Sequence, residues 1–389
     1  MKYDFDEIIN RIHTNSVKYE NSRREEPQLP MDFIPLWIAD MDFACPPEVI
    51  KEMHKRLDER ILGYSDIIEP AYVQTLSAWM QRHFNWDIRE EELVVSSGVV
   101  PAISNLIQIL SEKDDRVLFL TPSYGPFYTS VVNNGRIPVF SPLVKENGRY
   151  GIDFEDMEKK IIEESVKIFI FCSPHNPTGR VWSEDELKRA AGICKKHHVS
   201  VICDEIHQDL LRKGIMHIPL AKLYPDEDWV YTCTAPSKTF NMAGNHLANI
   251  FIPNKKVKEV WEERYYYLPN ALSITAAQAA YGQGGAWVEQ LKEYLDGNFN
   301  YLKEYLNKNL PKIKFEIPEG TYLAWLDMSG TGLDEKEVKR RFIAEAGLHI
   351  EGGDMFVANG ECNIRMNLAC PRQTVEKALN RMYKVFGTC

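Results

Sequence analysis

The segment TCTAPSKTFNMAG, residues 232–244, places a lysine in surroundings that are unusual for that residue. Lys238 follows the apolar run 229–234, and small and hydroxyl side chains flank it. A second apolar run, 199–203, ends directly before the acidic pair Asp204–Glu205. An isolated lysine is ordinarily a solvated surface residue. These flanks indicate instead a buried amine that works together with a buried carboxylate.

Strand-like and helical patterns alternate along most of the chain. Short runs rich in apolar, β-branched and aromatic residues lie at 93–96, 116–121, 137–143, 166–172, 199–203, 229–234 and 247–252. Amphipathic segments at 101–110, 154–164 and 183–197 separate several of them, and the last begins with the capping-box spacing of Ser183 and Glu186. Continuous apolar strands alternating with helices are typical of a mostly parallel sheet covered on both faces. The sequence therefore predicts an α/β fold whose main sheet has seven strands.

The two ends of the chain follow a different pattern. Residues 1–47 are rich in proline toward their end, and we expect an irregular segment that wraps over another part of the protein. Beyond residue 285, helical patterns at 286–309, 334–346 and 373–385 and a strand pattern at 363–369 alternate less regularly, which is typical of a smaller α+β domain. We predict a large domain of residues 48–285 and a small domain formed by 1–47 and 286–389.

Composition excludes several classes of protein. The net charge of −10 argues against a general nucleic-acid binder, which needs a basic face. The eight cysteines form no C-x-x-C pair, so neither a disulfide framework nor a metal site is expected. The N-terminal residues have no apolar signal region, and no stretch approaches 18 apolar residues. We therefore expect a cytoplasmic protein without a membrane span.

Four predicted strands are followed by residues that can bind a ligand. After the run 93–96, Gly98 begins a strand-to-helix turn with free backbone N–H groups. After the run 166–172, Asn176 lies in the segment SPHNPTG, where neighbouring prolines restrict the backbone. Asp204 follows the run 199–203, and Ser237–Lys238 follows the run 229–234. Parallel sheets bind ligands beyond the carboxyl ends of their strands. An anion cradle, an amide, a carboxylate and an amine are thus expected to meet at one edge of the sheet.

This set of groups matches the needs of pyridoxal 5'-phosphate (PLP). A lysine amine condenses with the PLP aldehyde to form a Schiff base, and the freed amine can then act as a base beside the substrate Cα. A carboxylate beside the pyridine nitrogen keeps that nitrogen protonated, so the ring can accept electrons. The sequence predicts that Lys238 and Asp204 fill these two roles.

Nine motifs carry a resemblance to a known family. They are PLWIADMDF (35–43), GY (63–64), SSGVVPA (96–102), PSYGPF (122–127), SPHNPTGRVW (173–182), CDEIHQDL (203–210), APSKTFNMAG (235–244), EGTYLAWLD (319–327) and IRMNLACPR (364–372). With these motifs in order over nearly its whole length, the chain resembles the fold-type I PLP enzymes of the class I/II aminotransferase superfamily. More narrowly, it resembles the MalY/PatB branch of cystathionine β-lyases and cysteine C–S lyases. The resemblance implies the PLP-dependent transferase-like fold.

The resemblance also implies roles for individual residues. Lys238 would form the Schiff base, Asp204 would pair with the pyridine nitrogen, and Tyr124 would stack on the ring and take part in catalysis. The ring hydroxyl would be bound by Asn176, with His207 nearby. The phosphate would be bound by Ser237 and by the backbone of Gly98, Val99 and Val100.

Substrate binding and assembly are implied in the same way. Arg365 would hold the substrate α-carboxylate, with Asn176, Trp37 and Ala39 also at the substrate. Tyr64 would reach the phosphate from the other subunit of a homodimer with shared active sites.

Two positions depart from the wider superfamily, and several have an ordinary structural interpretation. His207 stands where a tyrosine is frequent in the superfamily, and His246 stands where an arginine often binds the phosphate. Phosphate binding would therefore depend on N–H groups, hydroxyls and the partner subunit.

Asn176 could serve only a turn, Arg365 could be a strand-edge charge, and Tyr64 or Tyr124 could be packing residues. Trp37 and Asp40 could line the entrance or simply pack. The GQGG at 282–285 follows no strand and is interpreted as a turn.

The favoured reaction is β-elimination from a sulfur amino acid such as cystathionine or cysteine. It would release a thiol (homocysteine or sulfide), pyruvate and ammonia. The alternative is an aminotransferase that uses the same lysine, because the two reactions share their residues. A third possibility is a PLP-fold protein that also binds a regulatory protein partner.

Overall fold

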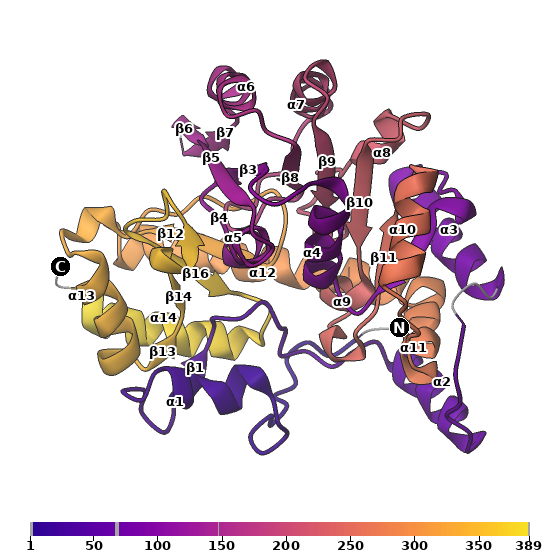
Figure 1. The fold of residues 1–389 in the computed structure, drawn as a ribbon. Coiled ribbons are helices and arrows are strands. Elements are labelled where there is room, and N and C mark those ends of the chain that lie inside the picture. The colour runs from indigo at the N-terminus through magenta and orange to yellow at the C-terminus, as the bar shows by residue number, and fades with distance from the viewer. Residues whose placement is uncertain (1–2, 67–69, 147, 388–389) are drawn as a thin grey trace.

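One seven-stranded sheet lies at the centre of the computed structural model, which describes residues 3–66, 70–146 and 148–387 (Figure 1). Its strands in spatial order are β2 (Leu93–Ser96), β11 (Ala248–Phe251), β10 (Val230–Thr234), β9 (Ser200–Asp204), β8 (Ile168–Cys172), β3 (Arg116–Thr121) and β5 (Ile137–Pro142). Only β11 runs antiparallel to its neighbours. The predicted α/β fold with a mostly parallel sheet is confirmed, and each strand coincides with one predicted apolar run.

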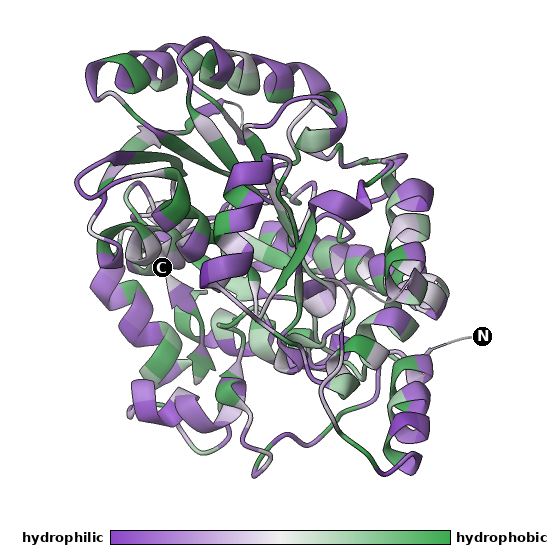
Figure 2. Cartoon of the chain, turned by 45° about the vertical axis from the view of Figure 1, so that its right-hand side comes forward, coloured by the Kyte–Doolittle hydropathy of each residue, from purple (hydrophilic) through white to green (hydrophobic). Residues whose placement is uncertain are grey.

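Helices cover both faces of this sheet because alternate strand residues point to opposite faces. In β8, Ile168 and Ile170 pack in one hydrophobic cluster with α4 (Val99–Leu110) and α5 (Gly125–Asn133). Phe169 and Phe171 pack in another cluster with α6 (Phe154–Glu163) and α7 (Glu184–Lys196). Figure 2 shows strands that are largely hydrophobic between helices of mixed character. Complete burial of such a side chain contributes about 1.5–3 kcal/mol, which explains why the strands are apolar throughout.

The start of α7 confirms the predicted capping box. The Ser183 side chain accepts a hydrogen bond from the Glu186 backbone N–H, and the Glu186 side chain accepts one from the Ser183 backbone N–H. The helix therefore begins where two otherwise unsatisfied N–H groups find acceptors.

The C-terminal part contains a second, antiparallel sheet with the order β12 (Leu323–Asp327), β16 (Asn363–Asn367) and β14 (Glu351–Gly352). The helix expected at 334–346 is α13 (Glu335–Arg340), followed by a π-helical turn at Arg341–Glu345, and α14 (Arg372–Phe386) ends the described chain. The long helix α12 (Gly285–Asn309) contributes Leu291 to the core beside the large sheet and Phe299 to the core of the C-terminal part. The proposed division into 48–285 and 1–47 with 286–389 stays a prediction, since this helix belongs to both cores.

The N-terminal segment crosses from one part of the protein to the other. A π-helical turn at Val17–Asn21 and the short helix α1 (Ser22–Glu25) form in the stretch before the prolines, where the sequence predicted irregular structure. Nothing in residues 17–25 removes a backbone donor, whereas the prolines begin only at Pro27. The strand β1 (Ile34–Pro35) then pairs with β13 (Leu348–His349). Among the described helices, none is long and apolar enough to cross a membrane.

Residues 38–42 are fixed firmly where the segment passes the large sheet. The amide of Asn367 donates to the carbonyls of Ile38 (2.8 Å) and Asp40 (2.7 Å). Lys18, which is fully buried, donates to the Asp40 carbonyl and pairs with Asp42 at 2.8 Å. A buried ammonium group is tolerated only when it is paired, so this network holds the segment in place.

Candidate active site

A cavity of about 550 Å³ lies at the carboxyl ends of the central strands. Its lining includes the predicted residues Gly98, Val99, Val100, Tyr124, Asn176, Asp204, His207, Ser237, Lys238, Arg365 and Ala39. Two predicted site residues, Trp37 and Tyr64, are not among the lining residues. The topology thus brings together side chains that lie far apart in the sequence, as expected for a parallel sheet.

Lys238 lies in the short helix α9 (Pro236–Thr239), directly after β10. Its Nζ donates a hydrogen bond to the Ala39 carbonyl at 2.6 Å, and the Tyr322 hydroxyl donates to the same carbonyl at 2.9 Å. Burial lowers the pKa of Lys238 to about 8, although the nearby Asp40 carboxylate opposes this shift. A larger fraction of the amine is therefore neutral near physiological pH, and the neutral form is the nucleophile.

The acidic pair that follows strand β9 separates into two environments. Asp204, the last residue of the strand, lines the cavity, and its Oδ1 accepts a hydrogen bond from the Ile206 N–H at 3.1 Å. Glu205 points elsewhere, and its Oε2 contacts the His217 Nε2 at 3.1 Å with both side chains fully buried. Consecutive residues of an extended chain face opposite sides, so only Asp204 can serve the cavity.

Burial raises the pKa of Asp204 to about 7, and its backbone hydrogen bond and Lys238 oppose this only in part. An isolated carboxylate in such a position is costly, and a cation held against it favours the ionised form. A protonated ring nitrogen would be such a cation.

His207 offers an unused polar atom beside the carboxylate. Its ring contacts Tyr322 edge-on, with centroids 6.0 Å apart, and burial lowers its pKa to about 3, so the ring is neutral. The buried Nδ1 has no hydrogen-bond partner within the described part of the chain. Buried polar atoms are nearly always paired, so this nitrogen fits a polar group of a bound molecule.

The start of α4 forms the anion cradle that the sequence predicted. Gly98 precedes the first turn, and the backbone N–H groups of Val99 and Val100 lie in that turn with no capping side chain. A helix N-terminus favours a negative group. Ser237 lines the same cavity, and so does His246. Cradle, carboxylate, amine and the orphaned nitrogen of His207 together fit PLP.

Arg365, on β16, is 1% exposed and is surrounded by acceptors. Its Nη1 donates to the Asn176 Oδ1 at 3.0 Å, and its Nη2 donates to the Trp37 carbonyl at 3.0 Å. Trp37 thus reaches the site through its main chain, while its indole ring stacks on His349 with centroids 4.7 Å apart. The guanidinium group also forms an ion pair with Glu351, which lines the cavity.

Glu351, which lines the cavity, and Tyr322, which contacts Ala39 beside it, are two residues that sequence reasoning missed. Glu351 faces Arg365 because the two are direct partners in the β14–β16 register. Tyr322 belongs to the EGTYLAWLD motif, so this motif was the available signal for it. No comparable signal marked Glu351.

The two predicted aromatic residues have opposite environments. Tyr124 lines the cavity from β4 (Ser123–Tyr124), which pairs with β15 (Phe356–Val357), and burial raises its pKa. Tyr64 is 99% exposed. Its predicted role at a second subunit stays a prediction.

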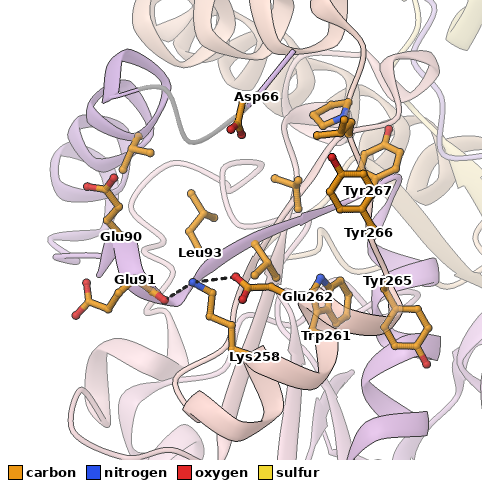
Figure 3. Close-up of a pocket in the computed structure, with 15 residues that line it drawn as sticks. Asp66, Glu90, Glu91, Leu93, Lys258, Trp261, Glu262, Tyr265, Tyr266 and Tyr267 are labelled. Carbon is orange, nitrogen blue, oxygen red and sulfur yellow. Dashed lines mark hydrogen bonds and ion pairs between the residues drawn. The ribbon is translucent and has the colours of Figure 1, made fainter. Parts of the chain in front are cut away.

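A second cavity, of about 530 Å³, lies at the edge strand β2 and is separate in its lining from the first (Figure 3). Its walls include Leu93 and the run from Tyr265 to Pro269, with Asp66 and Trp261. Lys258, in the lining, donates to the Glu91 carbonyl at 2.6 Å. The hydroxyl of Tyr267 donates to the His246 carbonyl at 2.6 Å, so one loop connects the walls of both cavities.

Comparison with a family model, with known proteins and with solved structures identifies the family of this chain. The family model of aminotransferase class I and II matches residues 31–382. Cystathionine beta-lyase PatB of Bacillus subtilis is 38% identical over 97% of this chain and 98% of that protein, and Protein MalY of Escherichia coli is 30% identical over 97% of each. The structure of a PLP-bound C–S lyase from Staphylococcus hominis is similar with a TM-score of 0.94 and 41% identity, over 99% of both chains. This chain therefore belongs to the class I and II aminotransferase family.

Proposed function

We propose that this protein is a PLP-dependent carbon–sulfur lyase that cleaves sulfur amino acids such as cystathionine or cysteine. One observation carries the proposal: Lys238, Asp204 and the N-terminus of α4 line one cavity at the ends of three strands. The relatives named cystathionine beta-lyase and C–S lyase favour elimination over other reactions of the family. The seven cysteines in the described residues are free, which supports the predicted cytoplasmic location.

Different residues of the cavity would bind different parts of PLP. When bound, PLP supplies an aldehyde that links to amines and a ring that withdraws electrons from the carbon beside the amine. Lys238 would carry that link, Asp204 would stay ionised beside the ring nitrogen, and Tyr124 would lie against the ring. Asn176 and His207 would bind the ring hydroxyl. Ser237 and the backbone N–H groups of Gly98, Val99 and Val100 at the start of α4 would bind the phosphate.

The chemical step then depends on Lys238 and Arg365. Arg365 would hold the substrate α-carboxylate, and the backbone of Trp37 and Ala39 would lie beside the bound substrate. With the substrate bound, the Nζ of Lys238 would take the proton from the substrate Cα. The Cβ–S bond breaks, its electron pair leaves with sulfur, and the thiolate takes up a proton. The three-carbon unsaturated amine that remains after the thiol has left would be hydrolysed by water to pyruvate and ammonia.

The proposed reaction predicts continuous pyruvate release without a keto acid. The holoenzyme is given L-cystathionine, or in a second assay L-cysteine, and pyruvate is followed with lactate dehydrogenase. We expect many turnovers per active site, because elimination regenerates the enzyme. An aminotransferase would stop after a single turnover until a keto acid is added, and that result would contradict the proposal.

Dimerisation is part of the proposal because Tyr64 is 99% exposed and does not line the cavity of its own chain. It lies beside the exposed Ile61 and Leu62, and Tyr266 near the second cavity is 79% exposed. Clustered exposed apolar side chains of this kind mark interaction surfaces. The hydroxyl of Tyr267, in the lining of the second cavity, donates to the carbonyl of His246 in the active-site wall, so this surface adjoins the active site. We propose a homodimer in which Tyr64 of the partner subunit reaches the phosphate.

Subunit mixing tests the shared site. Tyr64→Phe and Lys238→Ala chains are each expected to be poorly active alone, since each lacks one group in every site. A mixed dimer has one site with Lys238 from one chain and Tyr64 from the other, so up to half of the native activity should return. Mixed dimers are isolated by two affinity tags and assayed for pyruvate. Pure Lys238→Ala chains mixed with a Tyr64→Phe/Lys238→Ala double variant are the control and should stay inactive.

A further inference from the structure

Arg365 has few donors left for a substrate. A guanidinium group has five N–H donors, two on each Nη and one on Nε. The Nη2 group serves the Trp37 carbonyl and Glu351, and the Nη1 group serves the Asn176 side chain. The Nε atom is buried and has no hydrogen-bond partner within the described residues. A bidentate carboxylate therefore finds one of the two Nη groups already occupied.

The acceptor that occupies it is itself a carboxylate in the cavity wall. Glu351 and Arg365 are direct partners of adjacent antiparallel strands, where side chains on one face lie within reach of each other. The Glu351 side chain is 15% exposed and lines the same cavity as Lys238. Unlike the Trp37 carbonyl, which is part of a fixed backbone segment, a glutamate side chain can rotate away. Glu351 is thus the charged acceptor of Arg365, and a ligand can replace it without moving the main chain.

We propose that Glu351 is an internal competitor that binds Arg365 until the α-carboxylate of an amino acid displaces it. This inference rests on the proposed function only in taking an amino acid as the ligand. An amino acid is anchored at its amine as well, so it competes effectively against Glu351. A carboxylate that lacks the amine has no second anchor and is rejected. Glu351 therefore sets the selectivity of Arg365 for amino acids over other anions.

A purely structural role for Glu351 predicts the opposite result. If Glu351 only held Arg365 in its orientation, its removal would loosen the guanidinium group and weaken carboxylate binding. If Glu351 instead bound a substrate ammonium group, its removal would weaken binding of substrates with a distal amine. Displacement predicts tighter binding of simple carboxylates after the negative charge is removed, whereas neither of these two alternatives does.

The test measures binding of a carboxylate that cannot react. 3-(Methylthio)propionate has the carbon and sulfur skeleton of S-methylcysteine but no amine, and its Kd is measured by calorimetry with PLP-loaded Glu351→Gln and wild-type enzyme. We expect binding about tenfold tighter in the variant, the size typical of a hydrogen bond to a charged group. The KM for S-methyl-L-cysteine should fall while kcat changes little. Glu351→Ala provides a second variant, with the same expected direction, in case the amide keeps contact with Arg365.

Asp354→Asn is the matched control. This variant also removes a negative charge that acts on Glu351. The Asp354 side chain, however, is 49% exposed and pairs with Lys339 at 3.8 Å, not with Arg365. We expect its Kd for the probe to change less than twofold. Unchanged or weaker probe binding in both Glu351 variants, with native melting curves, would overturn the inference. Such a result leaves the proposed function standing, because that function fails only if the wild-type enzyme releases no pyruvate.

Discussion

Replacement of Lys238 by alanine is expected to lower kcat for pyruvate release by at least about 10³-fold, the upper part of the range for a lost proton-transfer group. The expected loss is this large because two roles depend on one nitrogen. The Nζ would carry the covalent link to the cofactor, and it would then take the proton from the substrate Cα. Neither Asp204 nor neutral His207 offers an amine in its place.

Two measurements check this prediction. Steady-state pyruvate release gives kcat, and borohydride treatment followed by peptide mapping identifies the lysine linked to PLP. We expect the reduced adduct at Lys238 in the wild-type enzyme and no adduct in the variant. Lys188→Ala is the matched control, since Lys188 is an exposed lysine paired with Glu184 on the surface. An adduct at another lysine, or nearly native turnover of Lys238→Ala, would refute the assignment.

Replacement of Asp204 by asparagine is expected to lower kcat by about 10²–10³-fold, as for other losses of a group placed against a developing charge. The side chain keeps its shape and can still accept the hydrogen bond from Ile206, so folding should be preserved. What is lost is the negative charge that would hold the ring nitrogen protonated. Covalent binding of the cofactor by Lys238 should survive, because it uses a different atom of PLP.

The readouts for Asp204 are kcat and the absorbance spectrum of the bound cofactor across pH. We expect the spectrum of the variant to report an uncharged ring where the wild-type ring is cationic. Asp226→Asn, at an exposed surface carboxylate paired with Arg89, should behave like the wild type. Native kcat in Asp204→Asn would show that this carboxylate does not serve the ring.

Most of the large sheet could be predicted from local pattern. Strand β8 buries alternate residues in two different hydrophobic clusters, so it has to be apolar at every position and is visible as a continuous run. Parallel strands joined by helices bring their carboxyl ends to one edge, and this rule alone places Gly98, Asn176, Asp204 and Lys238 together. The capping box at Ser183 predicted the first residue of helix α7 correctly.

The C-terminal part was less predictable, because its elements share cores with other parts of the protein. Helix α12 packs in two clusters, so no change in its sequence marks where one domain ends and the next begins. The helix expected at 334–346 changes to a π-helical turn after Arg340, a change in backbone hydrogen bonding that periodicity does not report.

Local pattern and strand order were enough to predict the fold and the meeting of Lys238 and Asp204 in one cavity, because both depend on neighbouring residues or on the order of the strands. Which partner each group contacts depends on tertiary packing. It separated Asp204 from Glu205, placed the carbonyl rather than the ring of Trp37 at Arg365, and set Glu351 opposite the same arginine. These contacts join segments far apart in the chain. They follow from register and packing, which no local pattern of residues records.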